Sequence, residues 1–194
     1  MLYPSKYTDR YIKEMDESVK KMLRVNGFNH GMVSLQSFVD DEGFYMCEMC
    51  YRPSGGHHYI LIKDQNGIDG LELLIEFALT GKVEGYNSEN ETPYFKEMCA
   101  MTHIVGKPLQ EIAVAEGFDT VAKLNGVIDV SQALFAGDTV GKDGTTAQVL
   151  GSVWFKAADF DGLCAAADTY NKALCFKDAE GNTLLKGRKF TETH

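Results

Sequence analysis

The stretch Phe44-Tyr45-Met46-Cys47-Glu48-Met49-Cys50-Tyr51-Arg52, followed by Pro53-Ser54-Gly55-Gly56, decides the fold that we expect for this chain. It comes after a second β-like run, residues 31–40, and the two runs are separated by Asp41-Glu42-Gly43. A three-residue loop that ends in glycine is a common hairpin connection, because glycine readily adopts the left-handed conformation. The sequence therefore predicts an antiparallel hairpin that ends where proline and two glycines interrupt the ladder.

The loop predicts the register of this hairpin. Counting back from it pairs Phe38 with Met46 and Gln36 with Glu48. Side chains alternate across a strand, so Glu48, Cys50 and Arg52 are expected on one face. Gln36 belongs to that face, with its Cβ atom only about 4.5–5.5 Å from that of its partner.

Two oxygen-bearing side chains with an arginine nearby favour a divalent-cation and phosphate site. Mg²⁺ is often held by one or two protein oxygens together with phosphate oxygens, and arginine binds anionic groups well. The alternative is that Gln36 and Glu48 form an ordinary solvent-exposed pair and that Arg52 has no function there. Residue types and spacing leave both interpretations open.

The rest of the chain predicts an α+β protein with antiparallel sheets and packed helices. Amphipathic periodicity indicates helices at 9–25, 68–82, 119–124 and 159–172, and β-like runs occupy 94–105, 126–134, 148–157 and 173–177. Residues 57–63 fit either a helical turn or a short strand. We expect two domains, residues 1–93 with the hairpin and residues 94–194 as a small α+β accessory domain.

Composition excludes several functional classes. The 194 residues carry 19 Lys and Arg against 28 Asp and Glu, a formal charge of −9 that disfavours nucleic-acid binding. No run is apolar enough to span a membrane, so no membrane partner is expected. The five cysteines are odd in number and scattered, and no signal peptide is evident, which predicts a reduced cytoplasmic protein.

Residues 31–82 resemble the metal-binding half of an ATP-grasp ligase, the superfamily of biotin carboxylase and carbamoyl phosphate synthetase. The hairpin run quoted above carries the resemblance, together with Gly67-Ile68-Asp69 at the start of the second helix. Family members place Glu, Asn and Arg at alternate positions of the last strand and a second metal ligand, Glu or Gln, twelve positions earlier. The corresponding residues here are Glu48, Cys50, Arg52 and Gln36, an interval equal to the cross-strand register.

The resemblance implies an ATP- and Mg²⁺-dependent (or Mn²⁺-dependent) ligase that joins a small carboxylate to an amine or ammonia through an acyl phosphate. It implies Glu48 and Gln36 as metal ligands on the nucleotide phosphates and Arg52 as the catalytic residue that holds the acyl phosphate. It also implies that Gly55 and Gly56 let backbone amides approach an anion.

Two departures from the family pattern qualify these roles. Cys50 replaces the usual asparagine, and a thiol is a poor ligand for a hard cation. The upstream lobe that holds the nucleotide is missing before Gly31, while the start, Tyr3-Pro4-Ser5-Lys6-Tyr7, resembles the piece that follows this lobe in carbamoyl phosphate synthetase-like ligases. The chain thus resembles the C-terminal portion of such an enzyme, and we expect it to be inactive on its own.

The alternative is a non-catalytic binding or assembly module that kept the ATP-grasp fold, which Cys50 favours. The missing lobe can also come from a separate chain, and a homodimer is among the expected assemblies. Zinc binding by Cys47 and Cys50 is disfavoured, because residues three apart on a strand point to opposite faces. The run Gly137-Asp138-Thr139-Val140-Gly141-Lys142-Asp143 has the wrong spacing for a phosphate loop and predicts a turn.

Overall fold

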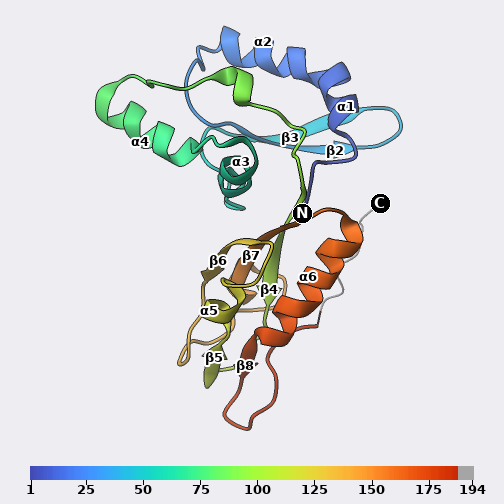
Figure 1. Ribbon diagram of the computed structural model, residues 1–194, viewed down its shortest axis with the longest axis vertical. Coiled ribbons are helices and arrows are strands. Elements are labelled where there is room, and N and C mark those ends of the chain that lie inside the picture. Colours follow the sequence, from blue (N-terminus) through green and yellow to red (C-terminus); the bar gives the residue numbers. More distant parts are fainter. Residues whose placement is uncertain (188–194) are drawn as a thin grey trace. The chain divides into compact units, whose positions relative to one another are not determined.

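A computed structural model describes residues 1–187 of the chain, which divides into two compact units. Residues 4–95 form one unit, here called the hairpin unit, and residues 1–3 with the chain after residue 95 form the other, here called the C-terminal unit (Figure 1). The expected division lay between residues 93 and 94. Residues 1–3 group with the later residues because strand β1 (Leu2–Tyr3) pairs with strand β4 (Met98–Val105).

The C-terminal unit is built on an antiparallel sheet with the strand order β1-β4-β7-β6. Strand β6 is Val127–Gln132 and strand β7 is Val149–Ala157, while β5 (Val114–Glu116) and β8 (Cys175–Lys177) form a separate antiparallel pair. The helices are α5 (Phe118–Val121), the 3-10 turn η3 (Thr146–Gln148) and α6 (Phe160–Ala173). Strands β4, β6, β7 and β8 and helices α5 and α6 lie close to the residue ranges expected from the sequence, whereas β1, β5 and η3 were not expected.

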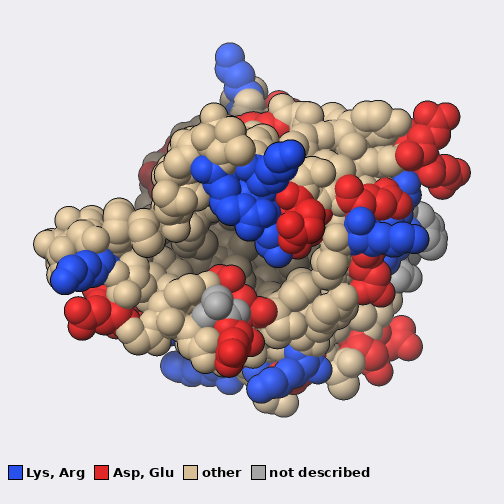
Figure 2. Space-filling model, turned by 90° about the horizontal axis from the view of Figure 1, so that it is seen from above, with Lys and Arg blue, Asp and Glu red and all other residues tan. Residues whose placement is uncertain are grey.

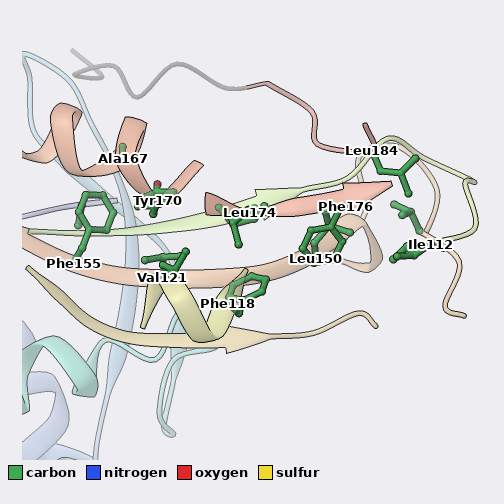
Figure 3. Close-up of a cluster of buried hydrophobic side chains, with 14 of the residues drawn as sticks. Ile112, Phe118, Val121, Leu150, Phe155, Ala167, Tyr170, Leu174, Phe176 and Leu184 are labelled. Atoms are coloured by element: carbon green, nitrogen blue, oxygen red, sulfur yellow. The ribbon is translucent and has the colours of Figure 1, made fainter. Parts of the chain in front are cut away.

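Helix α6 covers the sheet because its apolar residues recur at helical spacing. Its first turn is capped by Asp159, whose side chain accepts a hydrogen bond of 2.8 Å from the Gly162 amide. Leu163, Ala167 and Tyr170 are buried, and the Tyr170 ring meets the Phe155 ring of β7 edge-on at 5.2 Å. All four belong to one buried apolar cluster, and Figure 3 shows Ala167, Tyr170 and Phe155 within it, between α6 and the strands.

The hairpin unit begins with a helical segment where the sequence predicts one helix. Three consecutive pieces form it: α1 (Thr8–Tyr11), the π-helical turn η1 (Ile12–Asp16) and α2 (Glu17–Val25). Strands β2 (Ser34–Val39) and β3 (Phe44–Cys50) follow and form the predicted hairpin. Helix α3 (Tyr59–Asn66) resolves the ambiguous stretch in favour of a helix, and α4 (Gly70–Thr80) and the 3-10 turn η2 (Ser88–Asn90) complete the unit.

Helix α4 has clear start and stop signals. The Asp69 carboxylate accepts hydrogen bonds from the amides of Leu71 (3.2 Å) and Glu72 (3.1 Å), and it also pairs with the Lys63 ammonium at 2.6 Å. Gly81 ends the helix in the left-handed conformation, with a φ of 71°. The helix was expected over residues 68–82, so it is shorter by two residues at each end.

The apolar stripe of α4 is largely exposed. Leu71, Ile75 and Leu79 are 40%, 53% and 81% exposed, and no residue of α4 is fully buried. Periodicity identifies an apolar stripe but does not show whether another element covers it.

Among the helices of residues 1–187, none combines the length and the apolar character that a membrane span requires.

Candidate functional site

The loop of the β2–β3 hairpin is longer than expected. Val39 pairs with Phe44, which leaves the four residues 40–43 between the strands. The Asp40 carboxylate organises this loop by accepting hydrogen bonds from the amides of Glu42 (2.8 Å) and Gly43 (3.0 Å). The expected loop of three residues is therefore wrong, because the Asp40 side chain closes the turn one position earlier.

A β-bulge then restores the expected pairing of Gln36 with Glu48. Beyond the loop, Ser37 pairs with Met46, so the predicted partner of Met46 is wrong; Gln36 nevertheless pairs with Glu48. Cys47 is the extra residue of the bulge, and its thiol donates a hydrogen bond of 3.2 Å to the Gln36 carbonyl. The longer loop shifts the strand pairing by one residue from the expected register. The extra residue Cys47 shifts it back by one, so Gln36 and Glu48 pair as expected.

The bulge decides on which face of the hairpin Glu48 lies. Before it, Phe44 and Met46 share a face, and the Phe44 ring meets the rings of Tyr7 and Tyr11 edge-on at 6.4 and 5.8 Å. Strict alternation would put Glu48 on this helix-covered face. The extra residue moves it to the opposite face, which we call the open face.

The open face consists of three cross-strand pairs: Phe38 with Tyr45, Gln36 with Glu48, and Ser34 with Cys50. Phe38 and Tyr45 are 69% and 49% exposed, and Gln36 and Glu48 are also exposed. An aromatic pair thus lies next to an amide–carboxylate pair on an accessible strand surface.

The Cys50 thiol belongs to the same group of side chains as Glu48. It donates a hydrogen bond of 3.1 Å to Oε1 of Glu48, and this bond is the largest cause of a raised Cys50 pKa. Burial and the negative charge of Glu48 act in the same direction, while Arg52 acts against them. A neutral thiol that donates to Glu48 is therefore favoured in the absence of a ligand.

Arg52 lies beyond the regular part of the hairpin. Strand β3 ends at Cys50, so alternation along the strand does not fix the side of the hairpin on which Arg52 lies. The Arg52 side chain is exposed and donates a hydrogen bond of 2.9 Å to the Pro53 carbonyl. Its part in binding an acyl phosphate stays a prediction.

The predicted glycines follow in the turn that leads to α3. The His57 amide donates to the Ser54 carbonyl at 3.0 Å and closes this turn. A Cβ atom added at Gly55 would meet no atom within 4 Å, so no neighbouring atom crowds this position. The roles predicted for Gly55 and Gly56, close approach to an anion, remain predictions.

The oxygen donors of the open face fit a divalent cation, and the sulfur donor does not fit magnesium. Glu48 offers a carboxylate and Gln36 an amide oxygen, which suit a cation completed by water or phosphate oxygens. Cys50 adds a soft donor beside them. Within residues 1–187 no three His, Cys, Asp or Glu side chains lie close enough together to hold a metal ion, so any such site depends on the Gln36 amide as well.

Sequence reasoning missed a cavity of about 240 Å³ in the hairpin unit. Its walls come from α3, α4 and the segments around residues 29–32 and 83–91. The His30 ring stacks on Phe77 at 5.1 Å, and burial, with a hydrogen bond to Glu91, raises the pKa of Tyr86 to about 12. No sequence signal could have revealed it, because its lining residues come from four separate stretches.

The surface charge agrees with the composition. On the face seen in Figure 2, one group of adjoining Lys and Arg side chains lies beside Asp and Glu side chains, and further side chains of both signs are scattered around it.

The fold is shared with solved structures of ATP-grasp ligases. The L-amino acid ligase from Bacillus licheniformis matches 90% of this chain with a TM-score of 0.70 and 17% identity. The phosphoribosylglycinamide synthetase from Anaerococcus prevotii matches 90% with a TM-score of 0.67 and 16% identity. The biotin carboxylase domain dimer of the Hydrogenobacter thermophilus 2-oxoglutarate carboxylase, in complex with MgADP, ADP and bicarbonate, matches 91% with a TM-score of 0.68 and 15% identity.

The chain has the fold of the C-terminal half of an ATP-grasp ligase. It spans 43%, 44% and 38% of the lengths of the three matching chains, respectively. No family model and no curated protein matches the sequence. The expected fold class, antiparallel sheets with packed helices from the C-terminal half of this fold, is confirmed.

Proposed function

We propose that the chain forms the metal- and phosphate-binding part of an ATP-dependent ligase that joins a carboxylate to an amine or ammonia through an acyl phosphate. The observation that carries this proposal is the bulged register, which puts Glu48 beside Gln36 on the open face. The ATP-grasp fold supports it, because the solved structures that share the fold are ligases and a carboxylase domain, one of them with MgADP bound.

In this proposal the hairpin side chains bind and orient the charged groups of the reactants. Glu48 and Gln36 hold Mg²⁺ or Mn²⁺ on the nucleotide phosphates, and the bound ion offsets the negative charge of the phosphate oxygens. Arg52 holds the acyl phosphate, and the amides of Gly55 and Gly56 face an anionic oxygen. The carbamoyl phosphate synthetase-like type and a cytoplasmic location belong to the same proposal.

The proposal includes a nucleotide-binding lobe that is supplied by other residues of a longer protein or by a separate chain. Exposed apolar side chains in the hairpin unit support it, since Phe38, Tyr45, Ile75 and Leu79 are between 49% and 81% exposed. Large exposed apolar areas commonly mark surfaces that contact another polypeptide. We accordingly expect the isolated chain to bind Mg²⁺–ATP weakly and to turn over nothing.

The test is the variant Glu48→Gln in the full-length protein, with carboxylate-dependent ADP release as the measurement. We expect a loss of roughly 100-fold or more, because the charge that holds a catalytic metal contributes several kcal/mol to the transition state. Glu42→Gln, an exposed change in the same hairpin, is the matched control and should leave the rate unchanged. Equal rates for the two variants would refute the ligase role of the open face.

A second candidate function is a non-catalytic binding or assembly module with the ATP-grasp fold. Cys50 favours it, because a thiol stands where a hard cation needs oxygen. Under this alternative the full-length protein shows no ATP-dependent turnover, either with Cys50 or with Cys50→Asn. Turnover that increases in Cys50→Asn would favour the ligase.

A further inference from the structure

The cavity in the hairpin unit is a candidate site of its own and shares no lining residue with the open face. Helices α3 and α4, which adjoin in this unit (Figure 1), supply its walls together with the segments around residues 29–32 and 83–91. Its lining is mainly apolar and includes Ile62, Leu74 and Phe77. We propose that the cavity binds an arylalkylamine, a small molecule with an aromatic ring and a primary ammonium group. The inference does not rest on the proposed function.

Close packing shapes one wall of the cavity. A Cβ atom added at Gly31, whose φ is 124°, would lie 2.7 Å from the Tyr51 hydroxyl oxygen, and one added at Gly70 would lie 3.0 Å from the Met32 sulfur. Glycine at both positions therefore lets neighbouring side chains approach the main chain closely. The Met32 side chain packs over the first turn of α4 and lines the cavity, so its methyl group reports on a bound ligand.

The segment 83–91, which forms another wall, is tied to both helices. The Glu84 amide donates a hydrogen bond of 3.0 Å to the Glu76 carboxylate of α4. The side-chain amide of Asn66, at the end of α3, donates one of 2.9 Å to the Thr92 carbonyl. These bonds lie near the two ends of the segment, so the two helices keep this wall in place.

The charge of the lining favours a cation. The Tyr86 hydroxyl donates a hydrogen bond to the Glu91 carboxylate, and both residues are exposed, so this pair is accessible to an entering molecule. A carboxylate accepts several hydrogen bonds, which leaves Glu91 capacity to accept from an ammonium group as well. Among the described residues that line the cavity, Glu91 is the one acidic side chain, and none is Lys or Arg. A phosphate or carboxylate ligand would therefore lack a cationic partner there.

The volume and the aromatic walls fit a small aromatic molecule. An apolar cavity of about 150 Å³ binds benzene, so the present cavity of about 240 Å³ has room for about ten non-hydrogen atoms. The rings of Tyr59 and Phe77 line it, and aromatic rings pack favourably against one another. 2-Phenylethylamine has this size, an aromatic ring to bury and an ammonium group to pair with Glu91.

Glu89 provides a matched control for Glu91. It lies two positions earlier in the same segment, is exposed and does not line the cavity. Replacing either glutamate with glutamine removes one negative charge and keeps the shape of the side chain. Only the change at Glu91 should alter binding in the cavity.

The experiment titrates the 194-residue chain at pH 8 with 2-phenylethylamine, with neutral 2-phenylethanol and with anionic phenylacetate, and follows the methionine methyl signals by nuclear magnetic resonance. We expect one saturable site, with the amine bound about fivefold more tightly than the alcohol and phenylacetate bound most weakly. Glu91→Gln should weaken amine binding about fivefold and change alcohol binding less than about twofold, while Glu89→Gln should change neither. Nuclear Overhauser effects should join the ligand ring protons to the Met32 methyl group and not to that of Met101, which is buried in the C-terminal unit.

Any of four results would overturn the inference: no saturable binding, phenylacetate bound as tightly as the amine, equal effects of Glu91→Gln and Glu89→Gln, or ligand contacts at Met101 in place of Met32. The series of three ligands needs no variant, so it tests the charge preference even if a variant fails to fold. The readout is also independent of ATP turnover, so the ligase proposal and this inference can fail separately.

Discussion

The C-terminal unit and the hairpin unit bury their apolar side chains to very different extents. The main core cluster lies entirely in the C-terminal unit and includes Phe155, Tyr170 and Phe176, which are at most 1% exposed (Figure 3). Of the fifteen large hydrophobic residues that are exposed within residues 1–187, twelve belong to the hairpin unit. One unit therefore places its apolar residues in a core, and the other presents many of them on its surface.

The main apolar core therefore lies in the C-terminal unit, and the candidate functional site lies in the hairpin unit. A closed core explains why the C-terminal unit folds, and its residues need no ligand to account for them. The accessible strands of the hairpin unit hold chemically active side chains, Gln36, Glu48 and Cys50, on a face that a ligand can reach.

The largest expected effect is the loss of a core ring compared with the loss of an open-face ring. Phe176→Ala should lower the free energy of unfolding by about 3–5 kcal/mol, because it removes a fully buried aromatic side chain. Phe38→Ala removes the same atoms from a side chain that is 69% exposed and should change stability by no more than about 0.5 kcal/mol. Urea unfolding of both variants measures the difference. Similar losses in both would contradict the contrast in burial between the units.

A smaller effect is expected at the start of α4. Asp69→Ala should cost about 1 kcal/mol of unfolding free energy, because the Asp69 carboxylate caps the helix. The control Asp41→Ala, in the exposed hairpin loop, should cost less than about half of that.

The Asp69 contribution should also depend on pH. The Lys63 ammonium and the amides of Glu72 and Leu71 hold the Asp69 pKa below its ordinary value of 3.8. The folded state thus favours the ionised carboxylate, and its stabilisation is present above that value and is lost as the pH falls through it toward the lower folded-state pKa. The stability difference between wild type and Asp69→Asn should shrink on acidification from pH 6 to pH 3. A difference that stays constant over this range would contradict the role of the charged cap.

The sequence predicted the fold class and the longer helices and strands, because periodicity and turn residues carry that information, but it did not predict the short strands β1 and β5 and left residues 57–63 open. The Gln36–Glu48 pair was predicted correctly from a hairpin with a three-residue loop and regular strands. The structure instead has a four-residue loop and a bulge at Cys47, and the two differences offset each other. Alternation cannot reveal a bulge, because Cys47 fits a regular strand as well as an irregular one. The exposure of Leu79 could not be predicted either, because periodicity does not show whether another element covers the apolar side of α4.

The central claim is that Gln36 and Glu48 lie together on the open face and bind a cation, and paramagnetic broadening by Mn²⁺ tests it most directly. Mn²⁺ accepts oxygen ligands and broadens nuclear magnetic resonance signals close to it. The side-chain amide signals of Gln36 should broaden at lower Mn²⁺ concentrations than those of Gln65, which is buried in α3, and the difference should disappear in Glu48→Gln. Equal broadening of both amides, or selective broadening of Gln36 that persists in Glu48→Gln, would contradict the account.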